Sequence, residues 1–281
     1  MSEAQDRLLQ ILRAPQGAPL PALPRTMLVG AHPDDETVLA GSRLPRLAQA
    51  LFVCVTDGAP RNGYDAERHG LTPEQYAEAR RRELEAVLAQ CGVAPGQVLS
   101  LDCPDQQATL LLAPASRKLA HLFAQHGTEV VLSHAYEGGH PDHDASAFIV
   151  HAAVALRRAA GAHAPAIIEM AGYRRRASGE RACGFLPRPD GAPDDALMFD
   201  LDAEEIRFKS GLVAGFATQR ETLSGLPIAA EGYRPAPAYD FREPPHAGKL
   251  HYENYPWGMT GERFRALAAG ALRELGLEAP L

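Results

Sequence analysis

The sequence predicts an α/β protein built on a doubly wound, mostly parallel β-sheet. Short apolar runs alternate along the chain with longer segments of helical periodicity, and such alternation is typical of parallel strands joined by crossover helices. The composition, with 46% hydrophobic and 22% charged residues, is that of an ordinary globular protein. A chain of 281 residues can bury a sizeable core. We therefore expect one large domain, or one domain with a substantial appendage.

Five runs are expected to form the strands of this sheet. Each is short and apolar; the run at 51–56, for example, stops at Asp57 and Gly58. A short apolar run that ends in turn-forming residues indicates a buried strand. The expected strands are residues 27–31, 51–56, 98–101, 129–133 and 166–170.

Helices are expected before, between and after these strands. The clearest is 72–90, because Thr72 can cap it, Pro73 suits its first turn and Gln75 completes a capping box. Gly92 then provides the usual helix end. The other expected helices are 6–14, 37–50, 114–126, 142–160, 203–216 and 262–275.

Three regions follow from this pattern. Residues 1–24 form a helix and a linker, 25–175 form the sheet core, and 176–281 form a loop-rich C-terminal extension that packs on the core. Within the extension, 246–258 contains two histidines, two tyrosines and the only tryptophan. Aromatic rings can contact sugars, but they also serve as packing patches or oligomer contacts. The sequence leaves these alternatives open.

Charge and cysteine content exclude several classes of protein. The net charge of -7 and the pI near 5.9 argue against a nucleic-acid surface, which requires a basic footprint. The four cysteines are scattered, without a Cys-x-x-Cys pair, so neither a disulfide framework nor a cysteine zinc site is expected. The N-terminus carries acids, unlike a signal peptide, and no apolar run approaches the length of a membrane span. We expect a cytoplasmic protein that acts on a soluble small molecule, binds no membrane and is compatible with a homo-oligomer.

Two similar polar motifs indicate a metal site. Ala-His-Pro-Asp-Asp-Glu (31–36) follows the first expected strand, and Gly-Gly-His-Pro-Asp-His-Asp (138–144) follows the fourth. Ligands in open α/β sheets bind at the carboxyl ends of strands, so the two motifs can face each other. His32, Asp35 and His143 would then supply two imidazoles and a carboxylate, a ligand set typical of catalytic zinc that also suits Fe²⁺. Helix capping alone would explain the acids but not the histidines.

This pair of motifs resembles the PIG-L/LmbE-type family of zinc-dependent N-acetylglucosaminyl deacetylases and related amidases. The similarity extends over about residues 27–173. It implies a Rossmann-like fold, a catalytic zinc ion (with Fe²⁺ as the alternative) and hydrolysis of an N-acyl group, often acetyl, from a small amino-sugar substrate by a metal-activated water.

The resemblance also implies roles for individual residues. It assigns His32, Asp35 and His143 as metal ligands, Asp34 as general base, His140 as the group that stabilises the oxyanion or assists the leaving amine, Asp142 as the residue that orients His140 and keeps it protonated, Arg80 as a substrate-binding arginine and Asp105 as an acceptor for a sugar hydroxyl. Gln106 and Gln107 depart from the common Asp-Gly pattern, which weakens the expected sugar contact.

Two other functions remain open at this stage. The motifs fit equally an amidase that cleaves a larger acyl group or a thiol conjugate. A non-catalytic sugar- or nucleotide-binding module is disfavoured, because it needs no base and because no Gly-x-Gly-x-x-Gly loop follows the first strand. Three further residues keep two alternatives each. His134, just after a strand, is expected to be a buried histidine with satisfied hydrogen bonds, with an approach to the site as the alternative. His69 and Arg61 are expected to be loop residues without a role, with contact to the substrate as the alternative.

Overall fold

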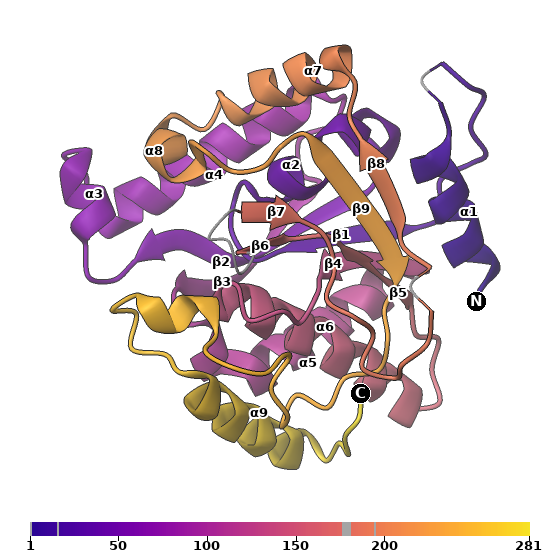
Figure 1. The fold of residues 1–281 in the computed structure, drawn as a ribbon, viewed down its shortest axis with the longest axis vertical. Coiled ribbons are helices and arrows are strands. Elements are labelled where there is room, and N and C mark those ends of the chain that lie inside the picture. Colours follow the sequence, from indigo (N-terminus) through magenta and orange to yellow (C-terminus); the bar gives the residue numbers. More distant parts are fainter. Residues whose placement is uncertain (1, 16, 176–180, 194) are drawn as a thin grey trace.

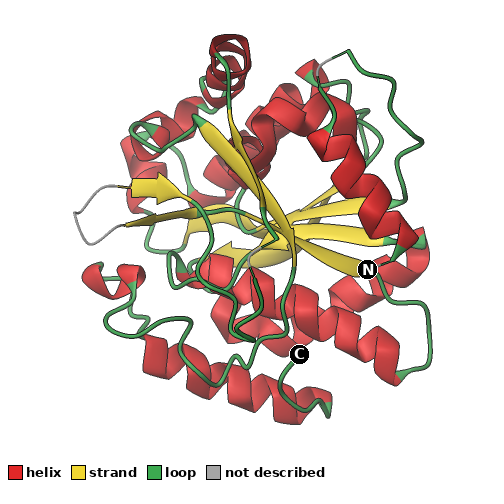
Figure 2. Cartoon of the chain, turned by 45° about the vertical axis from the view of Figure 1, so that its right-hand side comes forward, coloured by secondary structure: helices red, strands yellow, loops and turns green. Residues whose placement is uncertain are grey.

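A computed structural model describes residues 2–15, 17–175, 181–193 and 195–281, and it confirms the predicted α/β class. A mixed, seven-stranded sheet is covered by helices on both faces (Figures 1 and 2). Its strands are β1 (Thr26–Gly30), β2 (Leu51–Pro60), β3 (Val98–Asp105), β4 (Val130–His134), β5 (Ala166–Met170), β8 (Leu197–Asp200) and β9 (Ala230–Pro235); β6 (Tyr173–Arg175) and β7 (Arg181–Cys183) form a separate antiparallel pair.

The sheet order is β3-β2-β1-β4-β5-β9-β8. Neighbouring strands among the first five pair in parallel, whereas β9 pairs antiparallel with both β5 and β8. From β1 the chain winds outward through β2 and β3, and it then returns to β4 on the other side of β1. The carboxyl ends of β1 and β4 therefore lie at the point where the winding reverses, which is where open α/β sheets bind their ligands.

Each of the seven expected helical segments has a helical counterpart with somewhat different ends, and the described part of the chain adds two short helices that we did not predict, Tyr64–Arg68 and Arg220–Leu223. The helices are α1 (Glu3–Arg13), α2 (Asp35–Ala40), α3 (Tyr64–Arg68), α4 (Pro73–Gln90), α5 (Leu112–His126), α6 (Pro141–Ala159), α7 (Ala203–Val213), α8 (Arg220–Leu223) and α9 (Gly261–Leu275), with short 3₁₀ turns η1 (Gly41–Leu47), η2 (Ala108–Leu111), η3 (Ala217–Gln219) and η4 (His251–Asn254). The predicted capping box of Thr72 and Gln75 is present at α4. The predicted helix 37–50 is instead α2 followed by η1, which contains Pro45, a residue with no N–H to donate.

The C-terminal region differs from the expected loop-rich extension. We expected the sheet within residues 25–175, but β9 and β8 add two antiparallel strands beyond β5 and extend the sheet to Pro235. β8 is only four residues long and β9 comes from a stretch with little periodicity, so their pairing partners decide their conformation. Within the region, a fully buried ion pair joins α7 to β9: the Lys209 Nζ lies 2.9 Å from the Glu231 Oε1. The same Glu231 carboxylate accepts hydrogen bonds from the backbone N–H and the hydroxyl of Ser42.

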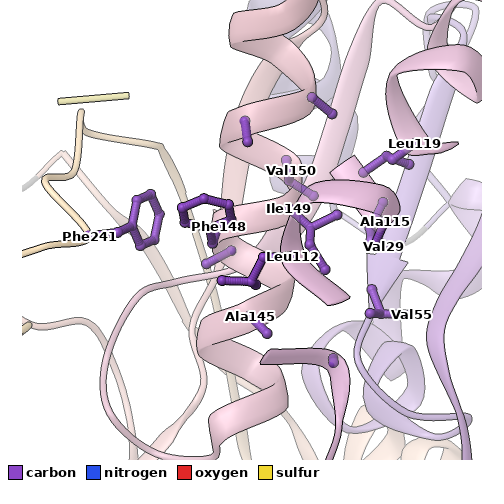
Figure 3. Close-up of a cluster of buried hydrophobic side chains, with 14 of the residues drawn as sticks. Val29, Val55, Leu112, Ala115, Leu119, Ala145, Phe148, Ile149, Val150 and Phe241 are labelled. Atoms are coloured by element: carbon purple, nitrogen blue, oxygen red, sulfur yellow. The ribbon is translucent and has the colours of Figure 1, made fainter. Parts of the chain in front are cut away.

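Two apolar layers hold the helices on the sheet. One face carries α1, α2, α4 and α7, and the other carries α5 and α6 with α9 outside them (Figure 1). Figure 3 shows part of the second layer, where Phe148 and Ile149 of α6 lie near Leu112 of α5 and Phe241 points at Phe148 from the C-terminal region. The rings of Phe148 and Phe241 are 5.2 Å apart and nearly perpendicular. The C-terminal region is thus part of the main core. In the described part of the chain, no helix is long and apolar enough to cross a membrane.

Loss of the Phe148 ring is expected to destabilise the protein strongly. Phe148 is 0% exposed, and Phe→Ala at such a site costs about 3–5 kcal/mol because it leaves a cavity. Chemical denaturation of Phe148→Ala measures this loss. Phe208→Ala is the matched control, because Phe208 is 38% exposed on α7 and a surface change of this kind costs within about 0.5 kcal/mol. Equal effects of the two substitutions would contradict the layered core.

Candidate functional site

A cavity of about 390 Å³ opens at the carboxyl ends of the parallel strands. Seven of the eight residues singled out in the sequence line it, from the turn after β1, from α4, from the end of β3 and from the start of α6. They are His32, Asp34, Asp35, Arg80, Asp105, His140 and His143. The eighth, Asp142, is 0% exposed and lies behind the cavity wall. The fold thus brings together side chains that are more than a hundred positions apart in the sequence.

The three predicted metal ligands meet at Asp35. Its Oδ2 lies 3.4 Å from His32 Nδ1, and its Oδ1 lies 3.3 Å from His143 Nε2. The backbone N–H of His32 donates to the same carboxylate at 2.7 Å and closes the turn between β1 and α2. Burial alone would raise the pKa of Asp35, but His143 and His134 lower it well below its usual value. A carboxylate held ionised between imidazoles is suited to a cation.

His134, at the end of β4, is closer to this centre than the sequence indicated. Its Nε2 lies 3.2 Å from Asp35 Oδ2, and its ring stacks on His143 with centroids 4.1 Å apart. Its Nε2 also accepts a hydrogen bond from the N–H of Ala31, as expected for a buried histidine with satisfied hydrogen bonds. Burial lowers the pKa of His134 to about 4, so the ring is neutral near pH 7. Its place at a strand end beside β1 is the signal that could have identified it.

The donor atoms fit a divalent metal ion. Three sets in the described part of the chain have donor atoms within 4.8 Å of one another: His32, His140 and His143; Asp35, His134 and His143; and His32, Asp105 and Asp142. Imidazole nitrogens with one or more carboxylates are the ligands that zinc and Fe²⁺ take in enzymes. His32 and His143 each belong to two of the sets, and Asp35 contacts a ring nitrogen of both, although no single set contains all three predicted ligands.

Two carboxylates contact the second nitrogen of His32. Its Nε2 lies 3.2 Å from Asp105 Oδ1 and 3.4 Å from Asp142 Oδ2. Burial would lower the pKa of His32, but these carboxylates raise it well above the usual value. A histidine ligand commonly donates its other N–H to a carboxylate, which fixes the ring and strengthens the ligand. This geometry gives Asp105 a positioning contact besides the predicted one to a sugar hydroxyl.

Asp142 has different partners from those predicted. We expected its carboxylate to orient His140, but it contacts His32 and accepts hydrogen bonds from the backbone N–H groups of Gln106, at 2.6 Å, and Ala108, at 3.1 Å. Gln106 has a left-handed φ of 64°, a conformation that favours glycine. Gln106 thus takes a glycine-like backbone conformation, and the Asp142 carboxylate holds this turn by accepting its backbone N–H.

His140 is oriented by the backbone instead. Its Nδ1 accepts the Asp142 backbone N–H at 3.1 Å as the N-cap of α6. Nδ1 is thus unprotonated, and the neutral imidazole carries its proton on Nε2. Burial and the neighbouring His32 and His143 lower the pKa of His140 well below its usual value. This environment favours a neutral N–H donor, in contrast to the protonated His140 that the sequence led us to expect.

Asp34 is held by Arg80. Arg80 Nη2 lies 2.6 Å from Asp34 Oδ2, while its Nη1 donates to the carbonyl of Gly58 at 2.8 Å. Burial raises the pKa of Asp34, and the Arg80 guanidinium opposes this rise. Arg80 is only 3% exposed but lines the cavity, so it holds Asp34, and its contact with a substrate stays a prediction. Gly58 has φ 68°, and a Cβ there would lie 2.6 Å from the guanidinium, so glycine is required.

The outer cavity wall contains residues without an assigned role in the sequence. His251, Tyr255 and Trp257 contribute from η4 and the segment after it, and α8 and its flanks contribute polar residues. The aromatic stretch 246–258 thus lies at the cavity. In contrast, Arg61 pairs with Asp57, and the ring of His69 lies 5.5 Å from that of Tyr76; neither lines this cavity.

The fold and this centre define a Rossmann-like α/β protein with a histidine–carboxylate site at its topological switch point. Residues 27–154 match the model of the PIG-L family, described as GlcNAc-PI de-N-acetylase. The matched stretch contains both motifs.

Relatives of known activity are similar over parts of the chain. A 1D-myo-inositol 2-acetamido-2-deoxy-alpha-D-glucopyranoside deacetylase of Catenulispora acidiphila is 28% identical over 43% of this chain and 48% of its own length, so the match spans about half of that relative. The structure resembles the A40926 pseudoaglycone deacetylase Dbv21 (TM-score 0.57, 21% identity, 75% of this chain and 96% of that one). It also resembles N,N'-diacetylchitobiose deacetylase from Pyrococcus horikoshii (TM-score 0.55, 17% identity, 84% and 92%).

Removal of His143 is expected to abolish tight metal binding. The purified protein, treated with chelator and reloaded, should bind about one zinc ion per chain, measured by atomic emission. Loss of a residue that only holds a metal ligand in place typically lowers metal affinity by about 10–100-fold, and we expect a loss of this size for Asp105→Asn. His143→Ala removes a predicted ligand itself and should lower zinc affinity by more. His121→Ala, an exposed histidine of α5, is the control. If His134→Ala loses as much zinc as His143→Ala, the ion is held by Asp35, His134 and His143 instead of the predicted set.

Proposed function

We propose that this protein is a zinc-dependent N-deacetylase that hydrolyses an N-acyl group of a small amino-sugar conjugate in the cytoplasm. The observation that carries the proposal is the position of Asp34: a buried carboxylate with a raised pKa beside the group formed by His32, Asp35 and His143. The match to the PIG-L family model supports the reaction class, and the deacetylases described above support an acylated amino sugar as substrate.

His32, Asp35 and His143 are the proposed ligands of the ion, on the donor chemistry given above. A zinc ion bound there would polarise the acyl carbonyl and lower the pKa of water to about 7. Asp105 and Asp142 hold the His32 ring in place through its Nε2. The protein's part is to keep these ligands fixed in a buried setting before the substrate arrives.

Asp34 is the proposed general base. A base is most effective when its pKa lies near the working pH, and burial moves the pKa of Asp34 upward. The carboxylate takes the proton from the attacking water and later delivers it to the departing amine, so that the C–N bond breaks with a neutral leaving group. Arg80 fixes the carboxylate through a 2.6 Å contact and prevents its rotation away from the cavity.

His140 is the proposed stabiliser of the oxyanion. Because Nδ1 accepts the backbone N–H of Asp142, the proton of the neutral ring is on Nε2. This N–H can donate to the carbonyl oxygen as negative charge develops on it, and one such donor typically contributes about 3 kcal/mol to the transition state. The role differs from a protonated general acid, because it requires no proton transfer from His140.

Asp34→Asn is expected to keep the metal and lose turnover. The amide has nearly the same volume but cannot accept a proton, so kcat should fall by about 10²- to 10⁴-fold. Hydrolysis of N-acetylglucosamine and related N-acetyl sugars, followed by release of acetate, measures the effect, and zinc content is determined in parallel. Asp102→Asn is the control, since Asp102 is an exposed carboxylate of β3 paired with Lys118. Near-full activity of Asp34→Asn would rule out its role as base.

His140→Ala is expected to lower kcat by about 10²- to 10³-fold without loss of zinc, since it removes one oxyanion donor. His140→Gln retains an N–H donor of similar reach and should recover part of the rate. A fall in zinc content equal to that of His143→Ala would instead identify His140 as a ligand, as in the set that it forms with His32 and His143.

A further inference from the structure

A row of aromatic rings leads from the reacting group into the outer cavity. The ring of Trp257 lies 4.6 Å from that of His140, and Tyr255 stacks on Trp257 with centroids 4.5 Å apart and planes 12° from parallel. His251 packs edge-on against Tyr255 at 5.2 Å. His140, His251, Tyr255 and Trp257 all line the cavity. We call His251, Tyr255 and Trp257 the aromatic wall.

The aromatic wall is fixed to the second metal motif. The backbone N–H of His251 donates to the carbonyl of Gly138 at 2.9 Å. Gly138 has φ 73°, and a Cβ there would lie 2.8 Å from Leu250, so this turn closely fits the segment that carries the wall. Glu253 closes the segment by accepting the backbone N–H groups of Leu250 and Gly261. The wall therefore has a defined position relative to His140.

The cavity is rich in carboxylates and offers no uncommitted Lys or Arg among the described residues that line it. Asp34, Asp35, Asp65, Asp105 and Glu221 contribute acids. The lining Arg80 is already paired with Asp34 at 2.6 Å. The guanidinium of Arg68, outside the lining, is paired with the Glu221 carboxylate. A substrate phosphate or carboxylate would therefore face these acids without an uncommitted guanidinium or ammonium partner from the lining, and recognition of such groups normally uses one.

Polar groups of α8 and its flank complete the outer cavity. Glu221, Thr222 and Ser224 line it together with the aromatic wall. In Figure 1, α8 lies on one side of the strand ends, and the yellow-orange segment before α9 lies on the other. One carboxylate and two hydroxyls supply the hydrogen-bonding groups that sugar hydroxyls require, while aromatic rings suit the apolar C–H face of a pyranose.

We propose that the aromatic wall and the α8 segment form a binding subsite for an uncharged pyranose ring, and that the substrates are neutral N-acylated glycosides without phosphate or carboxylate groups. The nature of the hydrolysed bond rests on the proposed function, but the sugar subsite does not. Trp257 is a specificity-determining residue in this assignment, because it lies between His140 and the outer cavity.

Intrinsic fluorescence tests the subsite without turnover. Trp257 is the only tryptophan in the sequence, so its emission reports on this cavity alone. The zinc-loaded wild-type protein, in which Arg80 stays paired with Asp34, is titrated with glucose, with methyl glucoside and with glucose 6-phosphate, none of which has an N-acyl group to hydrolyse. We expect saturable emission changes with the two neutral sugars and at least roughly 10-fold weaker binding of the phosphate. Emission that does not respond to the neutral sugars, or equal binding of the phosphate, would overturn the inference.

Kinetics of Trp257 variants separate this inference from the proposed function. Trp257→Leu should raise KM for the methyl glycoside of N-acetylglucosamine by about two- to 12-fold with kcat little changed. Trp257→Phe keeps an aromatic ring and should restore most of the affinity. Both variants keep an apolar side chain because Trp257 also packs on the core. Thermal unfolding verifies that they fold. Phe208→Ala is the control for loss of an aromatic ring outside the cavity.

The two proposals fail in different ways. Unchanged KM in Trp257→Leu with normal deacetylation would remove the subsite and leave the enzyme assignment intact. Saturable sugar binding by a protein that hydrolyses none of the N-acetyl sugars would remove the enzyme assignment and leave the subsite intact.

Discussion

The buried carboxylate of Asp35 is the constraint on which the rest of the site depends. It lies within 3.4 Å of nitrogens from His32, His134 and His143, and so joins the ends of β1 and β4 to the start of α6. Such a charge is costly to bury unless it is paired. The parallel pairing of β1 with β4 brings the partners together, and the site therefore forms only when the centre of the sheet is complete.

A second layer of contacts determines what each active-site group can do. Arg80 fixes Asp34, and Asp105 with Asp142 fixes His32. The backbone N–H of Asp142 selects the tautomer of His140. The separate environments move the pKa values of neighbouring groups in opposite directions, up for Asp34 and down for His140. The proposed base, Asp34, and the proposed neutral donor, His140, can therefore coexist beside the same group of ligands.

The C-terminal region shares the sheet, the hydrophobic core and the cavity with the rest of the domain. It supplies two strands of the sheet, the buried Lys209–Glu231 pair, the Phe241 ring in the core and the aromatic wall of the cavity. The central sheet with its two motifs provides the chemistry, and this region provides much of the surface that a substrate would meet. Variation here would change the substrate with little effect on the reacting groups.

The sequence alone determined the features that depend on neighbouring residues: five strands, the capped helix α4, and the turns that put His32, Asp35 and His143 at strand ends. The motif could also be matched to a family, which extended the prediction to Asp34 and His140. Only the tertiary structure decided which side chain the Asp142 carboxylate contacts, that β8 and β9 join the sheet, and that Trp257 lies against His140. These contacts join residues about 30 to 120 positions apart, and the local periodicity and capping that identify strands and helices carry no information about such pairs.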